Sequence, residues 1–174
     1  MLDRLLTREE IPLVWTIDRS EVIERVYRLE DGHLVLRPDY FDVRDWPPGE
    51  PEALTPLLYE CLDRGGVFYA VFDLARLVGV VVVDAKFLGP NRDLLQLKFL
   101  HVSRDYRGKG LGARLFGKAR QIARERGARG LYVSATPSQN TIDFYRRLGC
   151  TVTPVPDPEL FALEPEDIHL ECPV

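Results

Sequence analysis

The chain has 174 residues, of which 45% are hydrophobic, 10% aromatic and 29% charged. This length suits one ordinary domain with a buried core, and the hydrophobic content excludes a disordered chain. The 23 basic and 27 acidic residues give a formal net charge of -4, which argues against a general nucleic-acid-binding protein.

Cysteine usage and apolar runs indicate the environment of the protein. No window approaches the ~18 apolar residues of a membrane span, and charges occupy the first ten residues, where a signal peptide is apolar. The three cysteines, Cys61, Cys150 and Cys172, are an odd number without metal-ligand spacing, and the histidines are scattered. We therefore expect reduced thiols, a cytoplasmic location and no metal site.

In the first third of the chain, residues 11–17 read as a strand. Residues 21–37 fit a helix through the spacing of their apolar residues, but Asp31-Gly32 between two β-rich runs favours a hairpin, because both residues tolerate positive φ. Residues 38–51 carry four prolines and are predicted as a long loop. Leucines at helical spacing over 54–62 then predict a helix that Gly65-Gly66 ends.

The rest of the chain alternates between strands and helices. Strands are predicted over 67–72, 77–83, 94–102, 131–135, 150–155 and 168–172, and helices over 111–127 and 139–148, the second capped by Ser138. Nothing divides the chain, so we expect a single domain over 1–174. The predicted fold class is α/β (α+β), with a mixed sheet covered by helices on both faces.

The most informative stretch runs from Val102 to Ala113, where an apolar strand passes through a glycine-rich loop into an amphipathic helix. Glycines let a backbone approach a ligand closely, and the first amides of a helix have no intrahelical partner, so this loop suits a phosphate or pyrophosphate. A glycine turn that only packs the helix on the strand is the alternative. The spacing fits neither a Walker loop nor a dinucleotide fingerprint.

Two motifs in this half carry a family resemblance. Arg107-x-x-Gly110-x-Gly112 after a strand resembles the pyrophosphate loop of the GNAT superfamily of acyl-CoA-dependent N-acyltransferases. Asn140 followed by Phe144-Tyr145-x-x-Leu148-Gly149 resembles a second segment of that superfamily, in the expected order. The resemblance covers about residues 67–155, the expected cofactor-binding core. It implies a mostly antiparallel central sheet, and it leaves residues 1–66 to shape the acceptor site.

The resemblance also implies roles for individual residues. The backbone at Leu100 and Val102 would pair with the pantetheine arm of acetyl-CoA, which Asn140 would face. Tyr145 would reach the sulfur and protonate the departing thiolate as a general acid; the alternative is an aromatic core residue. The pyrophosphate would be bound by the loop amides of Arg107, Gly108, Lys109, Gly110, Leu111 and Gly112.

The general base is less clear. Gln96 occupies the strand position where some superfamily members have a carboxylate, and an amide cannot serve as a base. His101 has a suitable intrinsic pKa, but regular alternation places it on the face opposite Gln96 and Val102. Asp84 at a strand end, or an acid of the N-terminal half acting through water, is also open.

These features together predict an acetyl-CoA-dependent N-acetyltransferase in which an amine of a small molecule or peptide attacks the thioester directly. Acidic and aromatic residues of the N-terminal part would suit a cationic amine. Two alternatives are a non-catalytic acyl-CoA-binding regulatory module and a structural α/β domain. No nucleic-acid or membrane partner is expected, and a homodimer is open. The N-terminal residues in question are Glu21, Glu24, Tyr27, Tyr40, Phe41, Asp42, Asp45 and Trp46.

Overall fold

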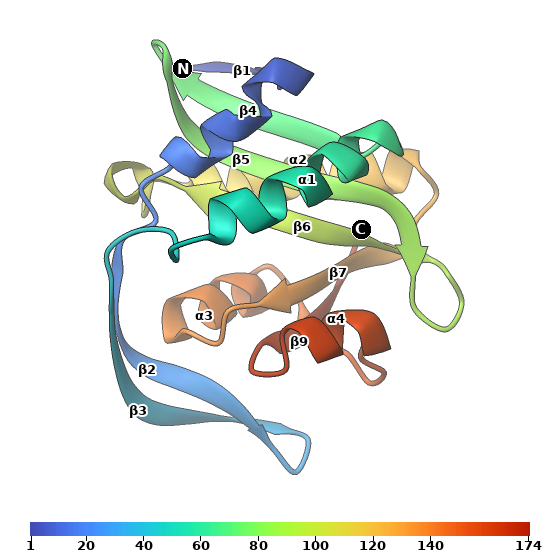
Figure 1. The fold of residues 1–174 in the computed structure, drawn as a ribbon. Helices are drawn as coiled ribbons and strands as arrows, with labels where there is room; N and C mark the ends of the chain where they lie inside the picture. The colour runs from blue at the N-terminus through green and yellow to red at the C-terminus, as the bar shows by residue number, and fades with distance from the viewer.

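The computed structural model describes residues 1–174 and contains a seven-stranded sheet in the order β1-β4-β5-β6-β7-β9-β8, with a separate two-stranded hairpin, β2-β3 (Figure 1). All neighbouring strands are antiparallel except β6 and β7. The elements are β1 (Leu2–Leu5), the 3-10 helix η1 (Arg8–Thr16), β2 (Glu21–Glu30), β3 (His33–Val43), α1 (Glu50–Asp63), β4 (Val67–Asp73), β5 (Arg76–Leu88), β6 (Leu94–Val102), the 3-10 helix η2 (Arg104–Tyr106), α2 (Leu111–Glu125), β7 (Gly130–Ala135), α3 (Gln139–Arg147), β8 (Thr151–Val152), α4 (Pro158–Leu163) and β9 (Ile168–Pro173).

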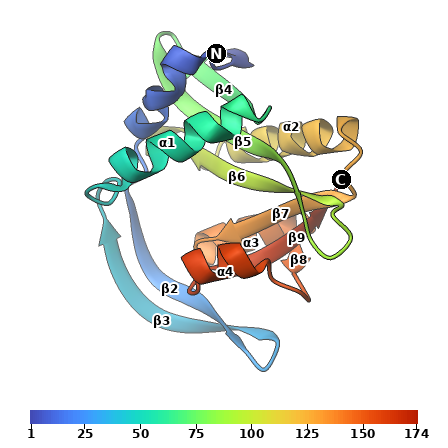
Figure 2. The same cartoon turned by 45° about the vertical axis from the view of Figure 1, so that its right-hand side comes forward.

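Helices cover both faces of the sheet, as the sequence predicts (Figure 2). Helices α2 and α3 bury apolar residues such as Leu115 and Ile142 in the larger core, on what we call the α2 face. The 3-10 helix η1 and helix α1 bury Ile11 and Leu58 in a second core on the opposite side, the α1 face. The predicted mixed, mostly antiparallel sheet is confirmed.

The predicted hairpin is also confirmed. Asp31 and Gly32 form its turn with φ values of 48° and 78°, which the Asp-Gly pair tolerates. The hairpin is joined to the body through β2, where the Tyr27 amide donates to the Pro137 carbonyl at 2.8 Å. The predicted loop over 38–51 is partly wrong, because β3 continues to Val43 and α1 begins at Glu50.

The N-terminal strand prediction is wrong. Residues 8–16 form a 3-10 helix, with β1 ahead of it. Ile11, Val14 and Ile17 are buried at intervals of three, which matches a 3-10 turn, and the Thr7 amide donates to the Glu10 carboxylate at 3.0 Å at the start. Alternating apolar residues in so short a segment do not distinguish this helix from a strand.

The prediction of three reduced thiols is wrong as well. Cys150 and Cys172 form a disulfide, and Cys61 is free and buried. Thr151 of β8 pairs with Glu171 of β9 in antiparallel register, so the preceding and following cysteines lie opposite each other. Sequence spacing gave no indication of this pairing. No helix combines the length and apolar character needed to cross a membrane.

Candidate active site

The strands β6 and β7 pair over only three residues and then diverge (Figure 1). The last pair is Gln96 with Tyr132, so residues 97–102 and 133–135 face an unpaired gap, which we call the β6–β7 opening. The Ser103 amide donates to the Val78 carbonyl of β5 at 2.9 Å. Because hydrogen-bonding direction alternates along a strand, the peptide groups of Leu100 and Val102 point away from β5, toward the opening.

The glycine-rich loop lies after the end of β6. Gly108 and Gly110 have φ values of 72° and 81°, a backbone conformation that favours glycine, and open space surrounds both. Gly110 caps α2, and no amide from Gly108 to Ala113 donates to another backbone group. The loop therefore presents a row of free donors at the positive end of the helix dipole, an arrangement that suits an anionic phosphate.

Arg107 lies differently from the expectation, whereas the Lys109 amide is free as expected. The Arg107 amide already donates to the Arg104 carbonyl at 3.1 Å, so it is not among the free loop amides. The Arg107 guanidinium donates to three backbone carbonyls, at 2.9 Å to Val102, 3.1 Å to Ser20 and 3.3 Å to Asp18. Its side chain thus ties residues 18–20 to the end of β6. Lys109 Nζ donates to the Asp105 carbonyl at 2.7 Å.

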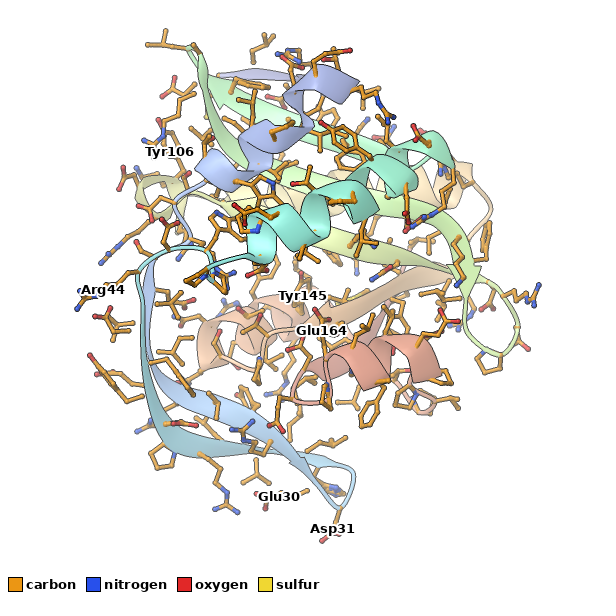
Figure 3. All side chains as sticks on the ribbon, viewed as in Figure 1. Glu30, Asp31, Arg44, Tyr106, Tyr145 and Glu164 are labelled. Carbon is orange, nitrogen blue, oxygen red and sulfur yellow. A yellow bond between two sulfur atoms is a disulfide. The ribbon has the colours of Figure 1, made fainter.

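Gly112 and Tyr145 connect α2 with α3. A Cβ atom at Gly112 would lie 3.3 Å from the Phe144 ring, so glycine allows the two helices to approach. Tyr145 is 5% exposed and stacks edge-on with Phe116 and Phe144. Figure 3 shows Tyr145 at the β6–β7 opening. Burial alone raises the pKa of its hydroxyl, which has no hydrogen-bond partner in the protein and stays protonated.

Asn140, at the start of α3, is exposed, and its Nδ2 donates to the Glu21 carboxylate of β2 at 2.9 Å. The side chain expected to face the pantetheine arm is thus engaged by the hairpin. This contact holds the start of α3 against β2.

A β-bulge changes the expected face of His101. Val82 pairs with Phe99 but Val83 pairs with Leu97, so Lys98 is an extra residue in β6. Leu97 and Leu100 therefore share the α2 face despite their odd spacing. Gln96 and His101 both lie on the α1 face, and the prediction that they point to opposite faces is wrong.

His101 lies in a ring of aromatic side chains on that face. The centroid of its imidazole lies 4.8 Å from the ring centroid of Trp46 and 5.3 Å from that of Phe99. Trp15 packs edge-on against Trp46 with a centroid distance of 4.8 Å. Burial, with the positive charges of Arg19 and Arg107, lowers the pKa of His101 to about 3. His101 is therefore neutral near pH 7 and a poor proton acceptor there.

The comparisons with known proteins identify the family. The model of the acetyltransferase (GNAT) family matches residues 29–150, which contain both motifs and both strands of the β6–β7 opening. The chain belongs to the GNAT family. An N-acetyltransferase of Methanocaldococcus jannaschii is 34% identical over 91 residues, which cover 50% of this chain and 39% of that relative. The match thus spans less than half of the relative's length.

Solved acetyltransferase structures share the whole fold. Nourseothricin acetyltransferase superposes with a TM-score of 0.71 at 23% identity over 99% of this chain and 97% of that chain. A streptothricin acetyltransferase assigned in Bacillus anthracis, solved with acetyl coenzyme A, superposes with a TM-score of 0.73 at 16% identity. The match covers 99% of this chain and 98% of that chain. PaiA N-acetyltransferase of Thermoplasma acidophilum, solved with coenzyme A, gives 0.61 at 16% identity over all of both chains.

Three polar residues near the opening were missed by the sequence analysis. The Ser134 hydroxyl of β7 donates to the carboxylate of Asp167 at 3.1 Å. Burial and the negative charge of Glu164 raise the pKa of the same carboxyl group. The two acids follow α4, a helix that the sequence analysis did not predict. No local pattern marked them, because they reach the opening only through the pairing of β9 with β7.

Proposed function

We propose that this GNAT protein is an acetyl-CoA-dependent N-acetyltransferase that acts on a primary amine of a small molecule or peptide. The observation that carries the proposal is the row of free amides from Gly108 to Ala113, next to the backbone of Leu100 and Val102, which no strand pairs on the side of the opening. The first group suits a pyrophosphate and the second suits the amides of an extended arm. Acetyl-CoA combines both features and supplies a thioester acetyl group.

Individual residues have distinct proposed roles. Gly108, Lys109, Gly110, Leu111 and Gly112 would bind the pyrophosphate through their amides, whereas Arg107 would organise the loop through its side chain. Tyr145 would hold the proton needed by the departing sulfur, because its buried hydroxyl is neutral and has no protein partner. Asn140 would contribute through the placement of α3.

Residues 67–155 would then form the cofactor-binding core, and residues 1–66 would shape the acceptor site within a single domain. The names of the nourseothricin and streptothricin acetyltransferases support a small-molecule acceptor. The two complexes with acetyl coenzyme A and coenzyme A support the donor. A cytoplasmic location remains a prediction, which the cysteines no longer support because Cys150 and Cys172 form a disulfide, and a homodimer remains open.

Calorimetric binding of acetyl-CoA and free CoA tests the cofactor site. Ala113 is exposed in the first turn of α2. An acidic side chain there interacts favourably with the positive end of the helix dipole, so the substitution should preserve folding. Ala113→Glu would nevertheless place a negative charge beside the pyrophosphate. We expect its affinity for both ligands to fall about tenfold or more, roughly 1.4 kcal/mol. Ala113→Gln has nearly the same size without the charge, and it should bind like the wild type.

Mass spectrometry of amines incubated with the protein and acetyl-CoA tests the reaction. Acetylated amine with charge-sensitive binding would support the enzyme. Binding without transfer to any amine would instead favour the acyl-CoA-binding module. The absence of binding to either ligand would overturn both and leave a structural domain.

A further inference from the structure

The proposed reaction requires a group that takes a proton from the amine, and this inference rests on that function. Gln96 cannot be this group. It forms the last pair between β6 and β7, with Tyr132, so its side chain lies where the strands separate. A carboxylate delivered to the same place by another element could take the role that Gln96 cannot fill.

Asp167 is that carboxylate. Ser134 lies two positions after Tyr132 in β7, at the β6–β7 opening. Val133 and Ala135 point into the α2-face core, so Ser134 points to the α1 face, which it shares with Gln96 and His101. The Ser134 hydroxyl donates to Asp167 Oδ2 at 3.1 Å. The segment before β9 thus brings an acid to the point where the two strands diverge.

The surroundings of Asp167 suit a proton acceptor. Burial and the negative charge of Glu164 raise the pKa of Asp167 to about 6, while the Ser134 hydrogen bond opposes them. No cation forms an ion pair with this carboxylate: the nearby Arg28 of β2 pairs with Glu166 and Asp39 instead. The titratable or charged groups that surround Asp167 or its partner Glu164 are Glu164 and Glu166 of its own loop, Arg28 of β2, His169 of β9 and Glu50 of α1.

Tyr145 has its hydroxyl free for a ligand at this place. Its side chain is 5% exposed, and its hydroxyl has no protein partner. Figure 3 shows Tyr145 at the β6–β7 opening, with Glu164 adjacent in the projection. Tyr145, the proposed proton donor, thus belongs to the α2 face, whereas Ser134 holds Asp167 on the α1 face, beyond the last pair of β6 with β7.

The other candidate bases are less suitable. Asp84 is buried in a two-point ion pair with Arg64, and the low pKa of His101 leaves it little basicity. Glu50 already lies 3.5 Å from Arg19, whose guanidinium stacks on Trp46. Of the three carboxylates compared, Asp84, Glu50 and Asp167, only Asp167 has no paired cation.

We propose that Asp167, supported by Glu164 and held by Ser134, accepts the proton from the acceptor amine. In the transfer, the nitrogen–carbon bond forms and the carbon–sulfur bond breaks. One proton leaves the nitrogen for Asp167, and the thiolate gains one from Tyr145. Water returns the Asp167 proton to Tyr145, so a neutral amine and acetyl-CoA give an acetamide and CoA without net proton change.

Carboxyl-carbon NMR of the free protein tests the acid without any substrate. One aspartate should titrate near pH 6, and its signal should be absent in Asp167→Asn. Glu164→Gln should lower the pKa of Asp167 because it removes a like charge, and Ser134→Ala should raise it because it removes a hydrogen-bond donor. An Asp167 that titrates near pH 4 in the wild type would overturn the proposal.

The pH profile of kcat/KM tests the role in transfer, with 1,4-diaminobutane, lysinamide and a tripeptide as acceptors. Below about pH 6, log kcat/KM should rise by about two units per pH unit, one from the amine and one from Asp167; above it, by about one. Asp167→Asn should follow the single slope throughout, with a rate at least about 100-fold lower and unchanged acetyl-CoA affinity. Ser134→Ala should move the break to higher pH.

Glu166→Gln is the matched control, because it also removes one negative charge, at the residue next to Asp167. The Glu166 side chain is 80% exposed. It should retain the wild-type profile. A wild-type kcat/KM in Asp167→Asn would overturn the role of Asp167, and so would a fall of kcat/KM in Glu166→Gln as large as that in Asp167→Asn. Either result would leave the proposed function intact. Failure of the wild type with all three acceptors would overturn both.

Discussion

Arg64 and Asp84 form a two-point ion pair, with Nε and Nη2 of the arginine donating to the two carboxylate oxygens at 2.7 and 2.5 Å. The Asp84 side chain is 3% exposed, and the Ala85 amide donates to it at 2.6 Å. The pair joins the end of α1 to β5. The strand-end acid that the sequence offered as a base therefore has a structural role.

Removing the arginine should destabilise the fold. Arg64→Met removes the two-point partner of a buried carboxylate and leaves only Lys98, whose Nζ lies 3.9 Å from Asp84 Oδ2, so we expect a loss of about 2 kcal/mol in the free energy of unfolding. Burial opposes ionisation, but the Arg64 and backbone hydrogen bonds outweigh it and lower the pKa of Asp84. The stabilisation is thus present above about pH 4 and is lost as pH falls through the lower folded pKa. Denaturation in urea at pH 7 and pH 3 measures both effects. A difference that grows at pH 3 would contradict the assignment.

Tyr145→Phe should separate catalysis from stability. The hydroxyl has no partner in the protein, so its removal should leave the melting temperature unchanged or slightly raised. Loss of the proposed general acid should lower kcat about 100-fold or more, with unchanged acetyl-CoA affinity, because the proton transfer matters only in the transition state. Calorimetry and steady-state kinetics measure the two effects. A variant that keeps full kcat would remove Tyr145 from the mechanism.

Reduction of the Cys150–Cys172 disulfide should destabilise the protein. The bond joins residues 22 apart, and a closed loop of this length contributes about 3 kcal/mol. Denaturation with and without reductant measures the difference. Cys150→Ala with Cys172→Ala should match the reduced wild type and be insensitive to reductant. Without reductant, the unfolded chain should react with a thiol reagent only at Cys61, whose pKa burial raises to about 12 in the fold.

His101 should remain neutral across the physiological range. Burial, Arg19 and Arg107 lower its pKa to about 3, so its ring protons should show no titration between pH 5 and 8. The unfolded chain binds a proton at this residue near pH 6.5, so its contribution to stability is present above that pH and declines as pH falls through it. Proton NMR assigned with His101→Gln tests this. Titration near pH 6.5 would contradict the burial of the ring.

Regular local signals explain most of what the sequence predicted. The Asp31-Gly32 turn, the strand Leu94–Val102 and the Ser138 cap, whose hydroxyl accepts from the Thr141 amide, each depend on residues close in the chain. The glycine loop was found for the same reason, because Gly108 and Gly110 need positive φ regardless of distant contacts.

The missed features depend on distant pairing. The Lys98 bulge shifts the faces of β6 through its register with β5, so alternation counted along the sequence gives the wrong side for His101. The disulfide depends on the pairing of β9 with β8, and the Ser134–Asp167 contact depends on the pairing of β9 with β7. The Arg107 amide was expected to bind the pyrophosphate, but it donates to the Arg104 carbonyl, and three other backbone carbonyls bind the guanidinium.

The divergence of β6 from β7 places a sheet edge inside the molecule. Exposed edge strands invite pairing with other chains, and proteins usually shorten or cover them. Here the peptide groups of Leu100 and the Val102 amide, which no strand pairs, lie between layers of helices, so only a narrow, extended ligand can complete the ladder. Bound ligand should therefore slow amide hydrogen exchange at these two residues more than elsewhere in the sheet, while the surrounding helices keep a second protein chain from this internal edge.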